Sequence, residues 1–272
     1  MSEPLRLRND AAEVEIVADR GGLVSRFAIA GAPVLFLDDA TLRDRTKNVR
    51  GGVPVLFPTP GKLAGDAGRC GDASGALPQH WFARNEAWRV AKASAEATEL
   101  ALAWPGDPAR WPWPCELAIR FALSGRTLRM DHRVTNNATT AMPFGLGFHP
   151  YFAIADGDKA RARVVTTATR AFDNATKRDV AITAPIDLTA KEVDLHLLDH
   201  GNASCTFELP GRTIALRGSP EFTHWVVWTL AGKDFVCVEP WTCPGNALNT
   251  GDRVITLEPG ASRALWLEIE AS

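Results

Sequence analysis

Three observations predict that the chain adopts an all-β fold, a large antiparallel β-sandwich. Apolar and polar residues alternate with a period of two in segments along the whole chain, as in strands with one buried face. Clusters of Gly, Pro, Asn and Asp separate these segments. No amphipathic helical pattern of about 12 residues or more is present. Because no Pro/Ser-rich linker divides the chain, we expect one β-sandwich domain over residues 1–272.

The expected strands follow in order. The first contains Val14 and Ile16, and the Gly21-Gly22 turn leads into a second that includes Phe27. Hairpin turns are predicted at Ser124-Gly125 and at Pro210-Gly211. The alternating positions of the other segments are Leu100/Leu102/Trp104, Cys115/Leu117/Ile119/Phe121/Leu123, Leu128/Met130/His132/Val134, Cys205/Phe207/Leu209, Ile214/Leu216 and Leu265/Leu267/Ile269.

Composition excludes several classes of protein. Apolar residues make up 46% and charged residues 23%, which is ordinary for a soluble globular chain. Lys and Arg number 30 against 32 Asp and Glu, without long single-sign runs, so neither nucleic acid nor a membrane surface is an expected partner. No apolar run is long enough for a signal sequence or a membrane span. Five scattered cysteines without a Cys-x-x-Cys pair favour a reduced, cytoplasmic protein without disulfides.

Two segments that depart from the strand pattern contain histidines. Residues 50–88 are too rich in Gly and Pro for the interior of a sheet, and we expect a long functional loop region that contributes His80 and several cations. In residues 143–152, Gly145 and Gly147 permit close backbone approach or a positive φ, and Pro150 fixes the backbone after His149. Either the His149 imidazole is aimed at a ligand, or it satisfies a loop carbonyl.

A third segment, residues 235–249, places a carboxylate at the end of an apolar strand. Glu239 follows Val236, Cys237 and Val238 and precedes Pro240. A carboxylate in such a place requires a partner or a chemical role, so Glu239 is either a catalytic group or a structural acceptor.

The other four histidines carry weaker signals. His196 and His200 have the spacing of two zinc ligands on a helix, but a third ligand motif is missing, so we expect a solvated turn there. His224 opens an apolar strand and is expected to be structural, and His132 is expected on a strand face without chemistry. No nucleophile-elbow, phosphate-loop or dinucleotide motif stands in a strand–helix context.

Four elements of the three segments, in this order, resemble the galactose mutarotase-like, or aldose 1-epimerase, superfamily, and within it the glucose-6-phosphate 1-epimerase branch. The resemblance covers most of the chain and implies the same large antiparallel sandwich. It also implies interconversion of the α and β anomers of an aldohexose. The elements are Arg50-Gly-Gly-Val-Pro with Phe57-Pro58, Leu77-Pro-Gln-His-x-Phe-Ala-Arg84-Asn-x-x-Trp88, Gly147-Phe-His-Pro-Tyr-Phe152 and Val238-Glu-Pro-Trp241.

The resemblance implies a catalytic role for His149 and Glu239. His149 is the expected general acid toward the ring oxygen, and Glu239 the expected base toward the anomeric hydroxyl. Ring opening takes a proton from O1 and gives one to O5, so acid and base must act from different positions. An imidazolium and a carboxylate can both be available near neutral pH. Neither a metal nor another cofactor is required.

The resemblance also implies substrate contacts. His80 is expected to orient the sugar or to stabilise charge on the ring oxygen, and Gln79 to contact the sugar. Arg50 and Arg84 are the expected partners of a 6-phosphate, since a guanidinium holds phosphate through paired hydrogen bonds. The alternative for each arginine is an ion pair that braces a loop.

Two departures from the family pattern concern the substrate. Trp81 replaces a small residue and is expected to narrow or reshape the sugar site. Asp173 is the best match, although a poor one, for an acidic residue that binds sugar hydroxyls.

The leading hypothesis is a hexose 6-phosphate mutarotase, with glucose 6-phosphate as its substrate. The alternatives are an epimerase of unphosphorylated hexoses and a non-catalytic carbohydrate-binding module on the same fold. We expect a monomer or weak homodimer whose partner is a small sugar or sugar phosphate.

Overall fold

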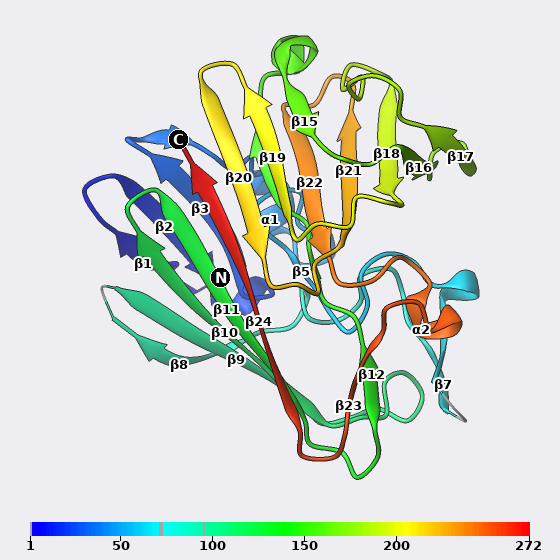
Figure 1. The fold of residues 1–272 in the computed structure, drawn as a ribbon. Coiled ribbons are helices and arrows are strands. Elements are labelled where there is room, and N and C mark those ends of the chain that lie inside the picture. The colour runs from blue at the N-terminus through cyan, green and yellow to red at the C-terminus, as the bar shows by residue number, and fades with distance from the viewer. Residues whose placement is uncertain (1, 71–72, 95) are drawn as a thin grey trace.

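The computed structural model describes residues 2–70, 73–94 and 96–272. It confirms the antiparallel, all-β architecture: two large sheets and a smaller four-stranded sheet face a common interior (Figure 1). The two α-helices among the described residues, α1 (Asp39–Arg43) and α2 (Ala247–Thr250), are each about one turn long. Neither is long and apolar enough to cross a membrane.

One large sheet, called here the β24 sheet, has its C-terminal strand near the middle. Its order is β15 (Arg163–Val165), β19 (Ser204–Leu209), β20 (Arg212–Gly218), β24 (Ser262–Ala271), β11 (Thr127–Asn136), β10 (Cys115–Ser124), β9 (Ala97–Trp104) and β8 (Arg89–Ala93). Both predicted hairpins are confirmed, with Ser124 paired to Thr127 and Leu209 paired to Arg212.

The other large sheet, the β22 sheet, carries the candidate functional residues. Its order is β17 (Arg178–Ala181), β16 (Arg170–Asp173), β18 (Glu192–Leu197), β21 (His224–Leu230), β22 (Phe235–Trp241), β13 (Gly147–Phe148) and β5 (Val55–Leu56), with β14 (Tyr151–Ala153) also paired to β22.

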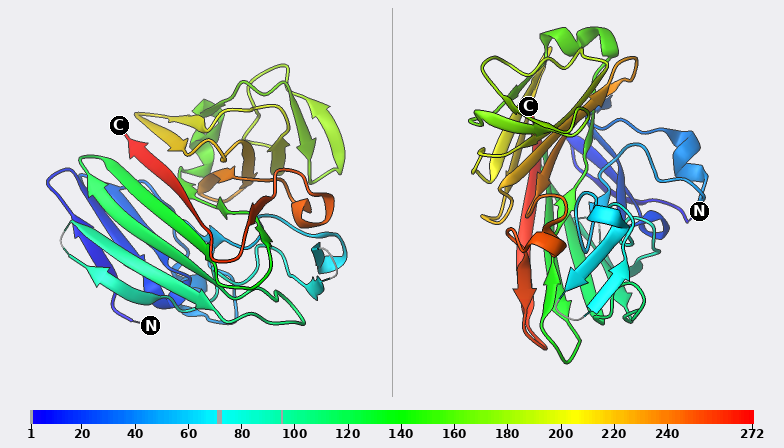
Figure 2. Two further views of the ribbon diagram at one scale, coloured as in Figure 1. Left: turned by 60° about the horizontal axis from the view of Figure 1, so that its bottom comes forward. Right: turned by 90° about the vertical axis from the view of Figure 1, so that its right-hand side faces the viewer.

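The remaining strands form smaller sheets. The four-stranded sheet is β1 (Leu5–Arg8), β2 (Ala12–Val17), β3 (Leu23–Ile29) and β4 (Ala32–Pro33), and two pairs are β12 (Met142–Phe144) with β23 (Ile255–Leu257) and β6 (Ala67–Cys70) with β7 (Ala73–Ala76). Both views in Figure 2 show α2 beside the β6–β7 hairpin, where the Asn249 amide donates to the Ala67 carbonyl at 2.9 Å. The described residues between 50 and 88 lie largely in loops, as expected, and the short strands β5, β6 and β7 interrupt them.

Strand alternation explains why β22 is buried on both sides. Val236 and Val238 belong to the large apolar core shared by the sheets. Glu239 and Trp241 point to the opposite face, as does Cys237. One face of β22 thus stabilises the sandwich, and the other is free to form the floor of a cavity.

Four of the five cysteine side chains are described, and each is buried and free. They are Cys115, Cys205, Cys237 and Cys243. The side chain of Cys70 lies outside the described part of the chain.

Candidate active site

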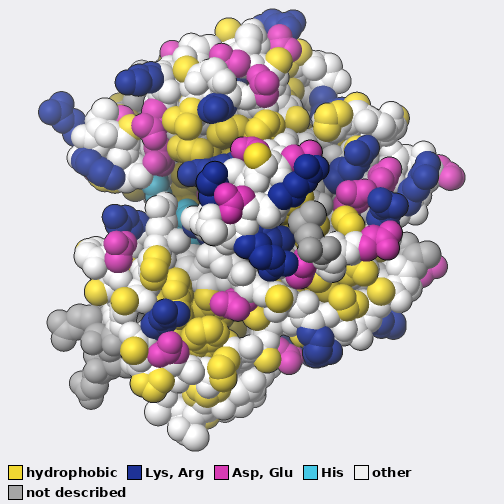
Figure 3. Space-filling model, turned by 180° about the vertical axis from the view of Figure 1, so that it is seen from behind, with side chains coloured by type: hydrophobic (Ala, Val, Ile, Leu, Met, Phe, Trp, Pro, Cys, Tyr) yellow, Lys and Arg dark blue, Asp and Glu magenta, His cyan; other side chains and the backbone are white. Residues whose placement is uncertain are grey.

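A cavity of about 540 Å³ opens on the face of the β22 sheet that carries Glu239. Its walls come from β16, β18, β21 and β22, from the loop before β5, from the 61–84 region and from residues 244–246. From behind, histidine side chains lie in a hollow with Lys and Arg side chains around it (Figure 3). A cavity of this size that converges on polar groups can hold a small ligand.

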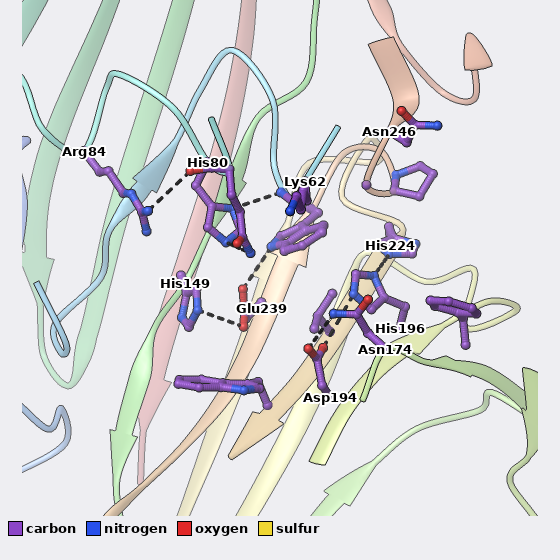
Figure 4. Close-up of a pocket in the computed structure, with 18 of the residues that line it drawn as sticks. Lys62, His80, Arg84, His149, Asn174, Asp194, His196, His224, Glu239 and Asn246 are labelled. Atoms are coloured by element: carbon purple, nitrogen blue, oxygen red, sulfur yellow. Dashed lines mark hydrogen bonds and ion pairs between the residues drawn. The ribbon is translucent and has the colours of Figure 1, made fainter. Parts of the chain in front are cut away.

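The register of three neighbouring strand segments brings His149 and Glu239 together. Gly147 pairs with Trp241, and Tyr151 pairs with Cys237. The residue midway in one segment, His149, therefore faces the residue midway in the other, Glu239. Nε2 of His149 lies 3.3 Å from Oε1 of Glu239, and both side chains are buried at 7% and 2% residue exposure (Figure 4).

Gly147 is required by close packing rather than by a positive φ. A Cβ on Gly147 would lie 2.7 Å from Cδ1 of Trp241 and 2.9 Å from Cβ of Pro60. Any side chain at this position would push the indole away, and the indole holds Glu239. Glycine is thus needed at position 147 because the side chain of the neighbouring strand β22 approaches the backbone closely.

The His149 ring is held by aromatic neighbours. It stacks on Tyr151 with centroids 4.6 Å apart and planes inclined by 11°, and it meets Trp228 edge-on at 5.6 Å. Burial, reinforced by the positive charges of Arg84 and Arg50, lowers the pKa of His149 to about 3. Burial therefore favours the neutral imidazole at physiological pH.

Burial has the opposite effect on Glu239. It raises the pKa of this carboxyl well above its usual range, and the charge of Asp194 adds to the increase. The indole Nε1–H of Trp241 donates to Oε2 at 3.2 Å and opposes part of the shift. Burial therefore favours the neutral form of each group, and His149 and Glu239 titrate as one unit.

His80 has a single compatible neutral tautomer. Its Nδ1 accepts a hydrogen bond from the backbone N–H of Gly61 at 2.9 Å, so the ring hydrogen is on Nε2. Burial lowers its pKa well below 6.5, so the ring stays neutral and acts as a donor. Nε2 of His80 lies 3.2 Å from the amide nitrogen of Gln79, and exchanging the nitrogen and oxygen of that amide places an acceptor opposite the ring hydrogen. His80 has a backbone φ of 63°, a left-handed conformation that is uncommon for residues other than glycine.

Arg50 and Arg84 line the cavity without a carboxylate partner among the described residues. Arg84 donates from Nη2 to the Gln79 carbonyl at 3.4 Å, its buried Nε has no hydrogen-bond partner, and burial lowers its pKa to about 10. The Arg50 guanidinium lies 5.5 Å from the centre of the Trp228 ring. The expectation that these arginines brace loops by ion pairs is thus not met, and both cations are available to an anionic ligand.

The residues of the opposite wall of the cavity were not predicted from the sequence as site residues. His196, expected in a solvated turn, lies in β18, and His224, expected to be structural, also lines the cavity. Asp194 and Asn174 complete this wall, joined by a 2.7 Å hydrogen bond from the Asn174 amide to Asp194 Oδ2. The available signal was strand alternation in Glu192–Leu197, which puts Asp194 and His196 on one face. His200, the second histidine of the predicted turn, is buried, and its ring forms hydrogen bonds with the Thr166 hydroxyl and the Ser204 carbonyl.

Two sequence predictions about this region are corrected. Asp173 does not line the cavity, because its neighbours Phe172 and Asn174 do and alternation turns Asp173 away. Its carboxylate instead accepts from the Ala175 backbone N–H at 2.9 Å and caps the following turn. Trp81 does not reshape the site either, since its ring packs in the core against Phe82 and Trp104.

One group of described side chains offers donor atoms for a metal ion. A nitrogen of His149, the Cys237 sulfur and a Glu239 oxygen lie within 4.8 Å of one another. This set does not favour a resident cation. Burial raises the pKa of the Cys237 thiol well above its usual range, and the charges of Arg50 and Arg84, which disfavour a cationic His149, oppose a metal ion as well.

The fold and the cavity define a class: an antiparallel β-sandwich protein with a buried imidazole–carboxylate pair at the base of a polar pocket. The chain belongs to the aldose 1-epimerase family, whose model matches residues 4–270. Family membership supports an epimerase or mutarotase activity on a small sugar.

Individual relatives agree with this assignment. A protein of Cenchrus ciliaris named "Putative glucose-6-phosphate 1-epimerase" is 26% identical, with 93% of this chain and 79% of that protein covered. The chromosomal LacX protein of Lactococcus lactis is 22% identical over 80% of this chain and 82% of its own length. Among solved structures, a structural-genomics target from Synechocystis sp. PCC 6803 has a TM-score of 0.95 at 32% identity, covering 100% of this chain and 96% of that one. A galactose mutarotase-like protein of Lactobacillus casei has the same fold, with a TM-score of 0.80 at 23% identity and 99% and 100% coverage.

Proposed function

We propose that the protein is a hexose 6-phosphate mutarotase that interconverts the α and β anomers of glucose 6-phosphate. The observation that supports it best is the His149–Glu239 pair, 3.3 Å apart, in a cavity that also presents two guanidinium groups without carboxylate partners in the described part of the chain. The pair supplies the chemistry, and the arginines supply affinity for a phosphate.

The geometry suits ring opening. O1 and O5 of a pyranose are both bonded to C1, so the groups that serve them must lie side by side. Nε2 of His149 donates a proton to O5 while the Glu239 carboxylate takes the proton from O1. The ring opens to the free aldehyde, the C1–C2 bond rotates, and reclosure reverses both transfers. Each general acid–base contribution is worth about 10²–10⁴-fold in rate.

The proton of the pair must move before ring opening starts. Burial favours neutral His149 and protonated Glu239, whereas the proposed catalysis uses the imidazolium and the carboxylate. These two forms of the pair hold the same number of protons and differ only in where one proton lies. We therefore propose the separate charges that the sequence predicts for the complex with substrate.

A bound phosphate assists that transfer. The charges of Arg84 and Arg50 are part of what keeps the His149 pKa low. A phosphate between them cancels this charge and raises the pKa of His149. It also cancels the Arg84 charge that helps to lower the pKa of Glu239, so the transfer gains mainly through Arg50, whose charge acts on His149. The neutral Nε2–H of His80 remains as a donor to the ring oxygen or an adjacent hydroxyl.

The test is magnetisation-transfer NMR of anomer exchange on glucose 6-phosphate, glucose and galactose with and without protein. We expect acceleration of the phosphorylated sugar above that of either free hexose. Faster exchange of the free hexoses would instead establish an epimerase of unphosphorylated sugars. Saturable sugar binding without exchange would establish a carbohydrate-binding module.

A further inference from the structure

One buried guanidinium outside the cavity holds the loop of residues 44–50, called here the Arg50 loop. Arg20 ends the short 3₁₀ helix η1 (Ala18–Arg20) between β2 and β3, and only 4% of this residue is exposed. Its Nη2 donates to three backbone carbonyls of α1 and the Arg50 loop, those of Thr41 at 3.0 Å, Asp44 at 3.3 Å and Lys47 at 3.1 Å.

The Arg20 side chain depends on this loop for its hydrogen bonds. Within the described part of the chain the three carbonyls are its only hydrogen-bond partners, and its buried Nε has none. Burying a charged group is unfavourable unless polar groups compensate for the lost water. An apolar side chain could fill the same space without that penalty. The guanidinium therefore does more than fill the core, because it ties η1 to the Arg50 loop.

Thr41 extends the restraint to the backbone of Arg50. The Thr41 hydroxyl donates to the Asp38 carbonyl at 2.9 Å and accepts from the Arg50 N–H at 2.9 Å. The Asp38 N–H in turn donates to the Arg50 carbonyl at 2.8 Å. Both backbone polar groups of Arg50 are thus bonded to the start of α1, and the carbonyl of the same threonine is bonded to Arg20.

The turn that carries Arg20 also supports the segment of the second cavity arginine. The Gly21 N–H donates to the Glu86 carbonyl at 2.9 Å. Gly21 has a φ of 79°, and a Cβ at this position would lie 2.2 Å from the carbonyl oxygen of Arg84, so only glycine permits the approach. This turn therefore contacts the Arg84 backbone directly and holds the Arg50 loop through Arg20.

We propose that Arg20 is a positioning residue for the phosphate of the substrate, because through Thr41 it fixes Arg50 relative to Arg84. Arg50 needs such support, since it is exposed and its guanidinium rests 5.5 Å from the centre of the Trp228 ring. Restraining the backbone before the ligand arrives reduces the entropy lost on binding. The phosphate part of this inference rests on the proposed function, but the restraint on Arg50 does not.

The first experiment measures the restraint without a ligand. Hydrogen exchange of the Arg50 backbone N–H, followed by NMR, reports local opening of its bond to Thr41, and core amides of β10 and β11 report global unfolding. We expect exchange at Arg50 to become about tenfold faster in Arg20→Met, while the core amides change less. An unprotected Arg50 amide in the wild-type protein, or unchanged exchange in Arg20→Met, overturns the restraint.

A matched pair of variants tests the second step and does not depend on the folding of Arg20→Met. Thr41→Val removes the hydroxyl and has nearly the same shape, whereas Thr41→Ser keeps the hydroxyl. We expect exchange at Arg50 to be about tenfold faster in Thr41→Val and within about threefold of wild type in Thr41→Ser. Equal exchange rates in the two variants would show that Thr41 does not carry the restraint.

The second experiment measures the consequence for the phosphate. We expect Arg20→Met to raise KM for glucose 6-phosphate and the Kd of inorganic phosphate about tenfold, and to leave KM for glucose unchanged. Arg20→Lys keeps the charge and three donors on a shorter side chain, and should recover part of the loss. Arg45→Met is the control, because Arg45 joins the same loop to Asp19 by an exposed ion pair and should change neither constant.

Double variants separate positioning from general damage to the fold. If Arg20 acts through Arg50, adding Arg20→Met to Arg50→Ala changes KM for glucose 6-phosphate no further, whereas the effect of Arg20→Met persists in Arg84→Ala. An effect that persists in Arg50→Ala, or an equal rise in KM for both sugars, overturns the positioning role. If the wild-type protein neither exchanges anomers nor binds phosphate, the proposed function fails, and hydrogen exchange at Arg50 still decides on the restraint.

Discussion

His149 stands directly across from Glu239 on antiparallel backbone, between the Gly147–Trp241 and Tyr151–Cys237 pairs. Their 3.3 Å separation is therefore set by strand register rather than by a mobile loop. A slip of one residue would turn Glu239 into the core, because side chains alternate. Strands hold catalytic groups more accurately than loops, and the proton transfers proposed here require that accuracy.

Loss of either His149 or Glu239 should abolish most of the catalysis, because the two residues act together. We expect His149→Ala and Glu239→Gln each to reduce kcat for glucose 6-phosphate by about 10²–10⁴-fold. The double variant should be little worse than the poorer single variant, since each group needs the other. Anomer exchange by NMR measures all three. His200→Gln, which alters a buried histidine outside the cavity, is the control and should exchange at the wild-type rate once folded. Undiminished exchange by either single variant would disprove the proposed roles.

Arg84 should discriminate between phosphorylated and free sugars. Arg84→Ala removes a charge-assisted contact, and we expect KM for glucose 6-phosphate to rise about 10- to 100-fold while KM for glucose stays unchanged. Arg163→Ala is the matched control, because Arg163 pairs with Glu208 on the exposed surface. Equal effects of Arg84→Ala on both sugars would show that this residue does not bind phosphate.

Inorganic phosphite should activate the enzyme toward glucose. A phosphite dianion between the arginines would cancel the charge that lowers the His149 pKa, and the imidazolium would form more readily. We expect the glucose exchange rate to rise with phosphite in the wild-type protein and not in Arg84→Ala. If phosphite acts only as a competitor of glucose 6-phosphate, without activation, the charge coupling is absent.

The Trp241 indole should set the alkaline limit of activity. Its N–H bond to Oε2 stabilises the Glu239 carboxylate and lowers its pKa. Trp241→Phe removes that donor, so the pKa rises and Glu239 loses its proton at higher pH. We expect the alkaline limb of the kcat/KM profile to move to higher pH and kcat to fall. A shift to lower pH, or none, would contradict this account.

Acid should destabilise the protein through its histidines. All six have a pKa lowered by burial, to about 3 for His132 and His149 and about 4 for His196. Below pH 6.5 the unfolded chain therefore binds protons that the folded chain does not, and the free energy of unfolding falls as the pH falls. Each histidine contributes a slope of at most about 1.4 kcal/mol per pH unit.

His132→Gln tests this contribution. His132 lies in β11, and its ring packs on Phe148 with centroids 4.6 Å apart, outside the cavity. Urea unfolding at a series of pH values between 4 and 7 should show a shallower pH dependence in the variant than in the wild-type protein. The slope is the quantity compared, since the substitution also changes packing. Identical slopes would mean that His132 titrates alike in both states.

The sequence by itself determined the strands. Alternation is local information, so β10, β11, β19, β20 and β24 were predicted from residues that are neighbours in the chain. Gly and Pro around His149 and the buried strand before Glu239 drew attention to both residues, but their pairing, like the cavity role of Gln79, His80, Arg50 and Arg84, needed the family resemblance.

Only the tertiary structure decided what faces the cavity. Asp173 was predicted there and Asp194 was not, because two acidic residues on adjacent strands look alike until strand pairing fixes which face each presents. Trp81 was expected in the site, but the direction of its side chain depends on the core formed by Phe82 and Trp104. The contacts that His224 makes with His196 and with Arg253 join three separate segments, and these segments become neighbours only when the chain has folded.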